Sequence, residues 1–277
     1  MSIALPRPTN HRQAEIVAIL AKSGRVVVED LAAQFGVTLQ TIRRDLNEMS
    51  EARLLVRVHG GAIAASGVAN LAYESRQHVA HSHKRLIGEA AARLVPNNAS
   101  LFINIGTTTE EAARALAGHS GLLVITNNLH VANELYRNAS IEVIVTGGTI
   151  RQGDGGIVGA VTVAQISQFR VDIAIVGTSA IDASGTLLDF DTREVEVSRA
   201  IIENARKVML VADSSKFSRA APVRIAHLSE IDVLVTDRLP SEEIAEMARQ
   251  CEVEIVETGG PDEVESADSQ KANVKEP

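Results

Sequence analysis

The sequence predicts an α/β protein preceded by a small helical domain, and three observations support this prediction. The chain has 277 residues, which is enough for about two domains. Near its start, two helical patterns meet at a single glycine, Gly36. Further on, seven short apolar runs between residues 100 and 257 alternate with amphipathic helical patterns, which is typical of a domain built on a largely parallel sheet.

The first domain is expected to begin with three helices. Thr9 or Asn10 can cap a first helix that ends at Gly24 and buries Ile16, Ile19 and Leu20. After a short extended segment at 26–28, a second helix at 29–35 ends at Gly36, because glycine adopts a positive φ at little cost. Thr38 then caps a third helix that runs to about Ser50. Two helices joined by a tight glycine turn are typical of a helix-turn-helix.

The third helix has one apolar face and one polar face. At 100° per residue its apolar side chains cluster together and are expected to be buried: Leu39, Ile42, Leu46 and Met49. The opposite face carries Gln40, Arg44 and Asn47, with Thr41 and Arg43 on its flanks. Gln, Arg and Asn suit base edges because they form bidentate hydrogen bonds. A solvated helix face is the alternative, and the preceding turn and cap weigh against it.

Residues 54–63 are expected to form a two-stranded wing after the third helix. Arg57 and His59 lie near its tip, where cations can contact DNA phosphates. Together with the helix, the wing provides eight candidates for contacts with double-stranded DNA: Thr38, Gln40, Thr41, Arg43, Arg44, Asn47, Arg57 and His59.

The run VTLQTIRRDLNEMSEARLLVRVHGGA at residues 37–62 resembles the signature of DeoR-type bacterial regulators. The resemblance implies a winged helix-turn-helix over residues 8–63 that binds an operator. It also implies that Gln40, Thr41, Arg43 and Arg44 enter the major groove.

Charge is distributed unevenly between the two parts of the chain. Residues 1–65 carry eight Lys and Arg against six Asp and Glu, whereas the remainder carries 19 against 29 and the whole chain has a net charge of -8. A mildly basic first domain on an acidic body fits a local anion-binding module, although chance fluctuation could produce the same pattern. The only cysteine, Cys251, excludes an internal disulfide and a Cys-based zinc site.

No segment of the sequence has the composition of a targeting signal or a membrane span. Residues 1–12 contain prolines and arginines and no apolar core, so they do not form a signal peptide. The expected location is therefore the cytoplasm, without membrane contact. Residues 64–82 are expected to be a linker, and residues 261–277 a disordered acidic tail.

The second domain, residues 83–260, is expected to alternate strands and helices. The predicted strands are 100–105, 122–126, 142–146, 172–177, 208–212, 231–236 and 252–257. The predicted helices are 83–95, 108–118, 129–137, 160–170, 192–205 and 241–250. In parallel sheets ligands bind beyond the carboxyl ends of the strands, so the loops after the strands are the expected binding site.

Those loops are rich in glycine, hydroxyl and amide side chains. One loop of this kind is usually a turn with a capping residue, but several at one sheet edge favour a small polar ligand that carries a phosphate. Lys216 would supply a countercharge. The candidate effector-binding residues are Gly106, Thr107, Thr108, Thr109, Thr126, Asn127, Asn128, Gly147, Gly148, Asp154, Gly177 and Lys216.

Two other kinds of site are not expected. A nucleotide is disfavoured because neither a GxxxxGK[ST] run nor a GxGxxG after the first strand is present. The histidines His78, His81 and His83 have a spacing that could gather a metal, but the sequence shows no obvious carboxylate partner, so a surface cluster is expected. We therefore expect no cofactor and no metal.

The body resembles the sensor domain of the same DeoR class, which is similar in fold to ribose-5-phosphate isomerase. In those isomerases an Asp-Gly-Ala-Asp motif carries catalytic carboxylates. The matching stretch here is Val176-Gly177-Thr178-Ser179, so both acids are missing. The resemblance thus implies ligand binding without turnover. The alternative, from a different functional class, is a sugar-phosphate isomerase or hydrolase.

Four stretches resemble most closely those DeoR-type repressors that respond to sn-glycerol 3-phosphate. They are LFINIGTTTEEAA, VITNNLHVANEL, GGIVGAVTVAQISQFRVD and LLDFDTREVEVSRAIIENARKVMLVADSSKF. The resemblance implies this phosphorylated metabolite as effector, release of the operator on binding, and a homo-oligomer, either a tetramer or a dimer. Asn104 and Ser218 depart from the pattern and could alter ligand preference, so another phosphosugar remains the alternative.

Overall fold

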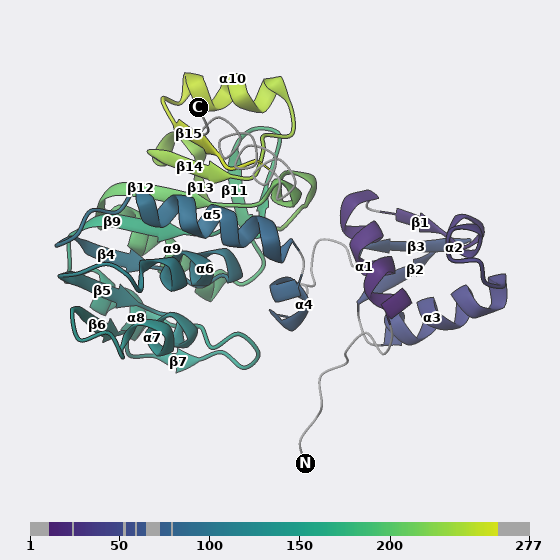
Figure 1. Cartoon of the computed structure of the whole chain (residues 1–277), viewed down its shortest axis with the longest axis horizontal. Helices are drawn as coiled ribbons and strands as arrows, with labels where there is room; N and C mark the ends of the chain where they lie inside the picture. The colour runs from purple at the N-terminus through teal and green to yellow at the C-terminus, as the bar shows by residue number, and fades with distance from the viewer. Residues whose placement is uncertain are drawn as a thin grey trace, which may run out of the picture. The chain divides into compact units, whose positions relative to one another are not determined.

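The computed structural model describes residues 11–23, 25–51, 54–58, 60–64, 73–78 and 80–259. The chain divides into two compact units. One comprises Met1–Val79 with Ala220–Pro222, and the other Ala80–Arg219 with Val223–Pro277. We call them the head and the sensor domain and describe each by itself. Figure 1 labels their helices and strands.

The head contains the three predicted helices, α1 (His11–Ser23), α2 (Val28–Phe35) and α3 (Leu39–Glu51). Gly36 ends α2 in the left-handed region, with φ of 62°. The Thr38 hydroxyl accepts a hydrogen bond from the backbone N–H of Thr41 at 3.2 Å, which caps α3. The helix-turn-helix expected from the sequence is therefore present.

The core of the head confirms most of the predicted apolar face of α3. Ile42, Leu46 and Met49 are buried there together with Ile16 and Leu31, the last two from the other helices. The prediction for Leu39 was wrong, because its side chain is 42% exposed. Helical side chains lean over the preceding turn of their own helix. Leu39 is the first residue of α3, so no preceding turn lies beneath it.

The wing has one more strand than predicted. Strands β2 (Leu55–Val58) and β3 (Gly61–Ala64) pair antiparallel, and β1 (Arg25–Val27) joins the other side of β3. A Cβ atom at Gly61 would lie 2.0 Å from the Val26 carbonyl oxygen. This close approach of β1 requires glycine and explains one of the two glycines in the wing.

The sensor domain is built on a parallel sheet of seven strands, and each lies within or next to one of the seven predicted apolar runs. Its order is β15-β14-β12-β9-β4-β5-β6. The strands are β4 (Ser100–Ile103), β5 (Leu122–Thr126), β6 (Ile141–Val145), β9 (Val171–Val176), β12 (Ala205–Val211), β14 (Val233–Thr236) and β15 (Glu254–Glu257).

Helices cover both faces of this sheet (Figure 1). On one face lie α5 (His81–Arg93), α6 (Thr107–Leu116) and α7 (Leu129–Leu135); on the other lie α8 (Ala160–Ile166), α9 (Thr192–Glu203) and α10 (Glu242–Gln250). Leu101 and Ile103 pack against the first group and Phe102 against the second. This alternation buries both faces, which accounts for the nearly continuous apolar strands.

Several short elements were not predicted. Strands β10 (Ala180–Ile181), β11 (Thr186–Asp189) and β13 (Val223–His227) form a small antiparallel sheet. Strands β7 (Thr149–Ile150) and β8 (Ile157–Val158) form a hairpin. The 3₁₀ helices are η1 (Ser214–Ser218) and η2 (Leu228–Glu230).

Parts of the predicted linker and the predicted tail lie outside the described residues. Within the stretch expected to be a linker, α4 (Tyr73–His78) is helical, and α5 begins at His81. Residues 65–72 and 261–277 are not among the described residues. None of the described helices is long and apolar enough to cross a membrane.

Candidate DNA interface and effector site

The polar face of α3 is exposed. Gln40, Arg43, Arg44 and Asn47 are all exposed, and Thr41 is half-buried. Arg44 Nε lies 3.0 Å from Glu48 Oε1, and the Arg44 side chain remains 82% exposed. Because exposed ion pairs of this type contribute little, Arg44 can leave Glu48 for another partner at small cost.

Buried polar contacts that the sequence did not reveal hold α3 against α1. Asp45 is 4% exposed and accepts hydrogen bonds from Arg12 Nε at 2.5 Å and Gln13 Nε2 at 3.4 Å. Gln13 also donates to Glu48 at 3.0 Å. The hydrogen bond to Asp45 raises the pKa of Arg12 above its usual value. These contacts fix the direction in which the polar face of α3 points.

The wing carries two residues predicted to contact phosphates, and Arg57 is the one that the structure describes. Arg57 is half-buried and donates from Nη1 to the Gly61 carbonyl at 3.0 Å, which holds its guanidinium against the hairpin. His59 lies outside the described residues.

The order of the parallel sheet creates a switch point between β4 and β9. Along the chain, β4, β5 and β6 extend the sheet in one direction, whereas β9, β12, β14 and β15 extend it in the other. The loops after β4 and β9 meet there: a Cβ atom on Gly177 would lie 3.6 Å from the Ile105 carbonyl oxygen. A switch point of this kind is where open α/β sheets bind ligands.

The loop after β4 leads directly into α6. Gly106 precedes the helix with φ of 150°, and Thr107, Thr108 and Thr109 are buried. Thr109 donates its hydroxyl to the carbonyls of Asn104 at 2.8 Å and Gly106 at 2.7 Å, so it supports the loop. The first N–H groups of α6 precede its first intrahelical hydrogen bond and are suited to an anion.

Asn104, which departs from the family pattern, uses its side chain for hydrogen bonds inside the sensor domain. It is 1% exposed, donates from Nδ2 to Ser198 Oγ at 2.8 Å and accepts from the Ile105 N–H at 2.7 Å. Asn104 therefore links the switch-point loop to α9. The other departure, Ser218, is exposed and donates to the Ser215 carbonyl at 3.0 Å.

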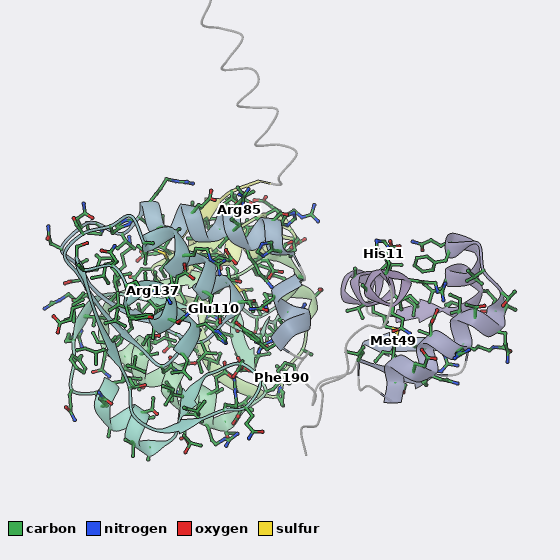
Figure 2. The ribbon with its side chains drawn as sticks, turned by 60° about the horizontal axis from the view of Figure 1, so that its bottom comes forward. His11, Met49, Arg85, Glu110, Arg137 and Phe190 are labelled. Carbon is green, nitrogen blue, oxygen red and sulfur yellow. The ribbon has the colours of Figure 1, made fainter. Side chains whose placement is uncertain are left out.

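The loop after β5 uses most of its polar groups internally. Thr126 donates its hydroxyl to the Ile103 carbonyl at 2.6 Å. Asn128 caps α7 by accepting from the His130 N–H at 2.8 Å, and donates from Nδ2 to Glu110 Oε1 at 3.1 Å. Glu110 itself lies among the packed side chains of the sensor domain (Figure 2).

The glycines after β6 have packing partners of their own. The Gly147 N–H donates to Gln165 Oε1 at 2.7 Å, and a Cβ atom at Gly148 would lie 2.2 Å from Thr162 Oγ1. Gln165 and Thr162 both belong to α8, so these two glycines pack the loop after β6 against that helix.

A buried cluster of opposite charges follows β12. Lys216 is 8% exposed, and Asp213 is 2% exposed. Burial raises the pKa of Asp213, but the charges of Lys216, Lys84 and Arg219 and the hydrogen bond from Ser215 together lower it by more, so its pKa lies below its usual value. Lys84, on the first turn of α5, is 2% exposed and was not predicted, since a lysine in a helical pattern gives no sign of burial.

The histidines near the start of α5 have carboxylate partners, contrary to our sequence interpretation. His83 Nδ1 lies 3.0 Å from Asp237 Oδ2, and His81 Nδ1 lies 3.7 Å from Glu111 Oε1. Asp237 follows β14, is 2% exposed, and also accepts from the Ser214 N–H at 2.6 Å. Within the described residues, no group of three or more His, Cys, Asp or Glu is placed to hold a metal.

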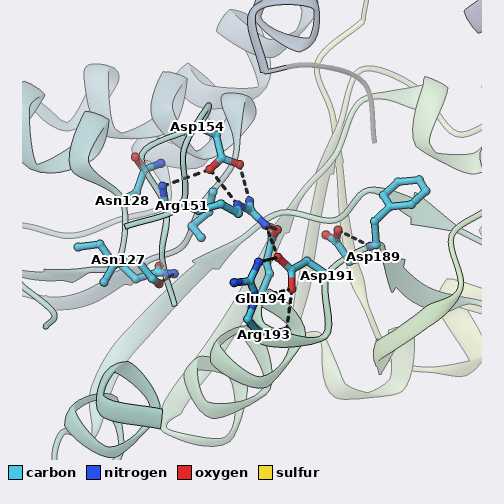
Figure 3. Close-up of polar contacts among 12 residues, drawn as sticks. Asn127, Asn128, Arg151, Asp154, Asp189, Asp191, Arg193 and Glu194 are labelled. Atoms are coloured by element: carbon cyan, nitrogen blue, oxygen red, sulfur yellow. Dashed lines mark hydrogen bonds and ion pairs between the residues drawn. The ribbon is translucent and has the colours of Figure 1, made fainter. Parts of the chain in front are cut away.

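Asp154, which the sequence predicts as a ligand contact, pairs with Arg151 (Figure 3). Arg151 is 16% exposed and also contacts Glu194 and, at 3.4 Å, Asp191. Burial lowers the pKa of Arg151, but its contacts with Asp154 and Glu194 raise it by more. This network joins the β7–β8 hairpin to the start of α9, and no local sequence pattern predicts it.

Asp191 is a carboxylate of this network with a lowered pKa. It caps α9 and accepts hydrogen bonds from the Arg193 side chain at 2.8 and 3.1 Å. These contacts lower its pKa from 3.8 to about 2, and Arg151 contributes a smaller effect of the same sign.

We expect Asp191→Asn to lower the free energy of unfolding by about 1 kcal/mol at neutral pH, since asparagine keeps the cap but loses the charge. A depressed pKa stabilises the fold above pH 4, and this contribution disappears as the pH falls toward 2. Urea unfolding at several pH values should therefore show wild type and variant converging in that window. A constant difference across it would contradict the assignment.

The comparisons with known proteins agree with both domains. Residues 12–68 match the DeoR-like helix-turn-helix domain, and residues 79–238 match the DeoR C-terminal sensor domain. The chain belongs to the DeoR family. It is 48% identical to the glycerol-3-phosphate regulon repressor of Haemophilus influenzae over 83% of this chain and 89% of that protein. For the repressor of the same name from Escherichia coli the identity is 46% over 83% and 91%.

As a DeoR-family member, the chain is a DNA-binding transcriptional repressor and not an enzyme, with an operator and an effector as partners. Among solved structures, ribose 5-phosphate isomerase A from Neisseria gonorrhoeae is 18% identical, with a TM-score of 0.36 over 48% of this chain and 52% of that one. That similarity concerns the fold only.

Proposed function

We propose that sn-glycerol 3-phosphate binds the sensor domain and releases the operator from the head. The observation on which this rests is the loop Gly106–Thr109 at the switch point, where buried hydroxyl groups and the start of α6 meet. A phosphate dianion bound there would accept N–H hydrogen bonds, which are stronger when the acceptor is charged. The names of the two relatives support glycerol 3-phosphate within this class of ligands.

Lys216 and Lys84 would add positive charge beside this loop. Both lysines are buried near the carboxyl end of β12, two strand spacings from β4. Within our predicted set, Gly106, Thr107, Thr108 and Gly177 are the residues assigned to direct phosphate contact, with Lys216 as countercharge. Thr109, Thr126 and Asn128 would support this arrangement through their internal hydrogen bonds.

The head would bind the operator through the exposed face of α3. Five residues would enter the major groove: Gln40, Thr41, Arg43, Arg44 and Asn47. Thr38, Arg57 and His59 would contact the DNA backbone. Helix-turn-helix proteins bind paired half-sites as dimers or higher oligomers. We therefore expect a homo-oligomer, a dimer or a tetramer, acting in the cytoplasm.

Titration of the operator complex with glycerol 3-phosphate, glycerol and other phosphosugars tests this proposal. Release by glycerol 3-phosphate alone is the expected result, because glycerol lacks the dianion. Release by fructose 1-phosphate or a deoxyribose phosphate, with no response to glycerol 3-phosphate, would favour a DeoR-type repressor with a different effector.

Arg44→Ala is expected to weaken operator binding by about 1–3 kcal/mol and to relax base discrimination, because it removes a bidentate contact. Arg85→Ala is a matched control: Arg85 lies on the surface of the sensor domain (Figure 2), is 64% exposed, and pairs with Glu89 at the same i,i+4 spacing. Affinities for operator and random DNA should be measured over a range of salt. An equal loss on both DNAs would make Arg44 a phosphate contact instead.

A further inference from the structure

Two buried polar atoms of the sensor domain have no hydrogen-bond partner among the described residues. They are Asn127 Oδ1 and Thr146 Oγ1. Asn127 is fully buried and Thr146 is 3% exposed. Nearly all buried polar atoms in folded proteins are hydrogen-bonded, so such a pair indicates a bound molecule that completes the contacts.

The two residues are neighbours at the carboxyl edge of the sheet. Strands β5 and β6 pair in register with Thr126 opposite Val145, and Asn127 and Thr146 are the next residues along. The Thr146 N–H donates to the Thr126 carbonyl at 3.0 Å, which continues that register. β5 also adjoins β4, whose loop carries the proposed phosphate contacts. Asn127, after β5, is therefore about one strand spacing from β4, and Thr146, after β6, is about two.

The orientation of the Asn127 amide is determined by its surroundings. Nδ2 donates to the Ile157 carbonyl at 3.2 Å, and the Ile157 N–H donates to the Asn127 carbonyl at 2.7 Å. Turning the amide over would place Oδ1 against the Ile157 carbonyl, two acceptors facing each other. The atom without a partner is therefore an acceptor, and it requires a donor.

We propose that Asn127 and Thr146 recognise the hydroxyl groups of the effector and so determine which phosphate ester the sensor domain accepts. This inference rests on the proposed function, since it assumes a phosphate at the Gly106–Thr109 loop. Asn127 Oδ1 accepts from one hydroxyl of a phosphorylated polyol, and the Thr146 hydroxyl donates to or accepts from the other. A ketone in place of the first hydroxyl has no hydrogen to donate. Its oxygen would face Asn127 Oδ1, and both atoms are acceptors.

This chemistry predicts an order of affinities for three-carbon phosphates. Glycerol 3-phosphate carries both hydroxyls, dihydroxyacetone phosphate carries a carbonyl at the central carbon, and n-propyl phosphate carries neither hydroxyl. A site that hydrogen-bonds a hydroxyl discriminates strongly against analogues that lack it, because its own polar groups are left unpaired. We expect the full-length protein to bind glycerol 3-phosphate at least tenfold more tightly than either analogue.

Calorimetric titration of wild type, Thr146→Val and Thr146→Ser with all three phosphates tests the inference. Valine matches threonine in shape but lacks the hydroxyl, whereas serine retains it. We expect T146V to weaken glycerol 3-phosphate binding about tenfold and to leave n-propyl phosphate binding unchanged, with T146S close to wild type. The unchanged propyl ester serves as the internal control for folding of the variant.

Each other outcome contradicts a distinct part of the account. If T146V leaves the preference for glycerol 3-phosphate unchanged, the two atoms hold a buried water and the inference is wrong. If n-propyl phosphate binds wild type as tightly as glycerol 3-phosphate, the phosphate site stands and the assignment of hydroxyl recognition fails. If no phosphate binds wild type, the proposed effector and this inference are both wrong.

Discussion

Replacing Arg151 with leucine is expected to destabilise the sensor domain by about 3–5 kcal/mol. The substitution leaves the carboxylates of Asp154 and Glu194 buried, at 5% exposure each, without the cation that pairs with both. Removing one partner of a buried ion pair costs far more than the pair itself contributes, because the remaining charge is uncompensated. Urea unfolding of the sensor domain measures the effect.

Arg193→Leu is the matched control for this prediction. Arg193 contacts the same Asp191, but its side chain is 58% exposed, so its loss should cost less than about 1 kcal/mol. Equal effects of the two substitutions would show that burial of the Arg151 network does not contribute as we infer. The Arg151 variant should also bind effector more weakly, because the hairpin segment that Arg151 anchors contacts the switch-point loop: a Cβ atom at Gly156 would lie 2.5 Å from Ile105 Cδ1.

Thr107→Asp is expected to give a repressor that binds its operator normally but does not respond to glycerol 3-phosphate. Thr107 is the first residue of α6 and is 8% exposed within the proposed phosphate loop. A carboxylate there would repel a phosphate dianion and occupy the N–H groups that should bind it. The fold should tolerate the change, because acidic side chains are favourable in the first turn of a helix.

Thr107→Asn separates the charge from the change of shape. Asparagine has nearly the same size as aspartate but carries no charge. T107N should therefore still release the operator in response to glycerol 3-phosphate, and the concentration required should rise much less than for T107D. We expect the concentration for half-release of the operator to rise at least a hundredfold for T107D. Loss of operator binding in T107D would make the loop structural, and an unaltered response would place the phosphate elsewhere.

The main sheet could be predicted from the sequence because each of its strands is a short apolar run buried on both faces. The strands β7, β8 and β10 could not, since each has two residues and shows no periodicity. The extended segment at 26–28 was expected, but its pairing as a third strand of the wing was not, because β1 has three residues and its partner lies in a hairpin far along the chain.

For the site, the sequence predicted which loops meet but not which side chains remain available to a ligand. The hydroxyl and amide residues do follow neighbouring strands, as the parallel topology requires. The charged pairs around them join distant positions: Arg151 pairs with Glu194, 43 residues away, and Asp237 pairs with His83, 154 residues away. Such pairings depend on tertiary packing, and no local pattern encodes them.

Reciprocal binding measurements test most directly the claim that one chain couples an operator-binding head to a polyol-phosphate site. Operator affinity is measured with and without saturating glycerol 3-phosphate, and glycerol 3-phosphate affinity with and without saturating operator. Because coupling between two sites is reciprocal, both affinities must fall by the same factor, which we expect to be about 5-fold to 150-fold. An operator affinity that is the same with and without bound glycerol 3-phosphate would contradict the account.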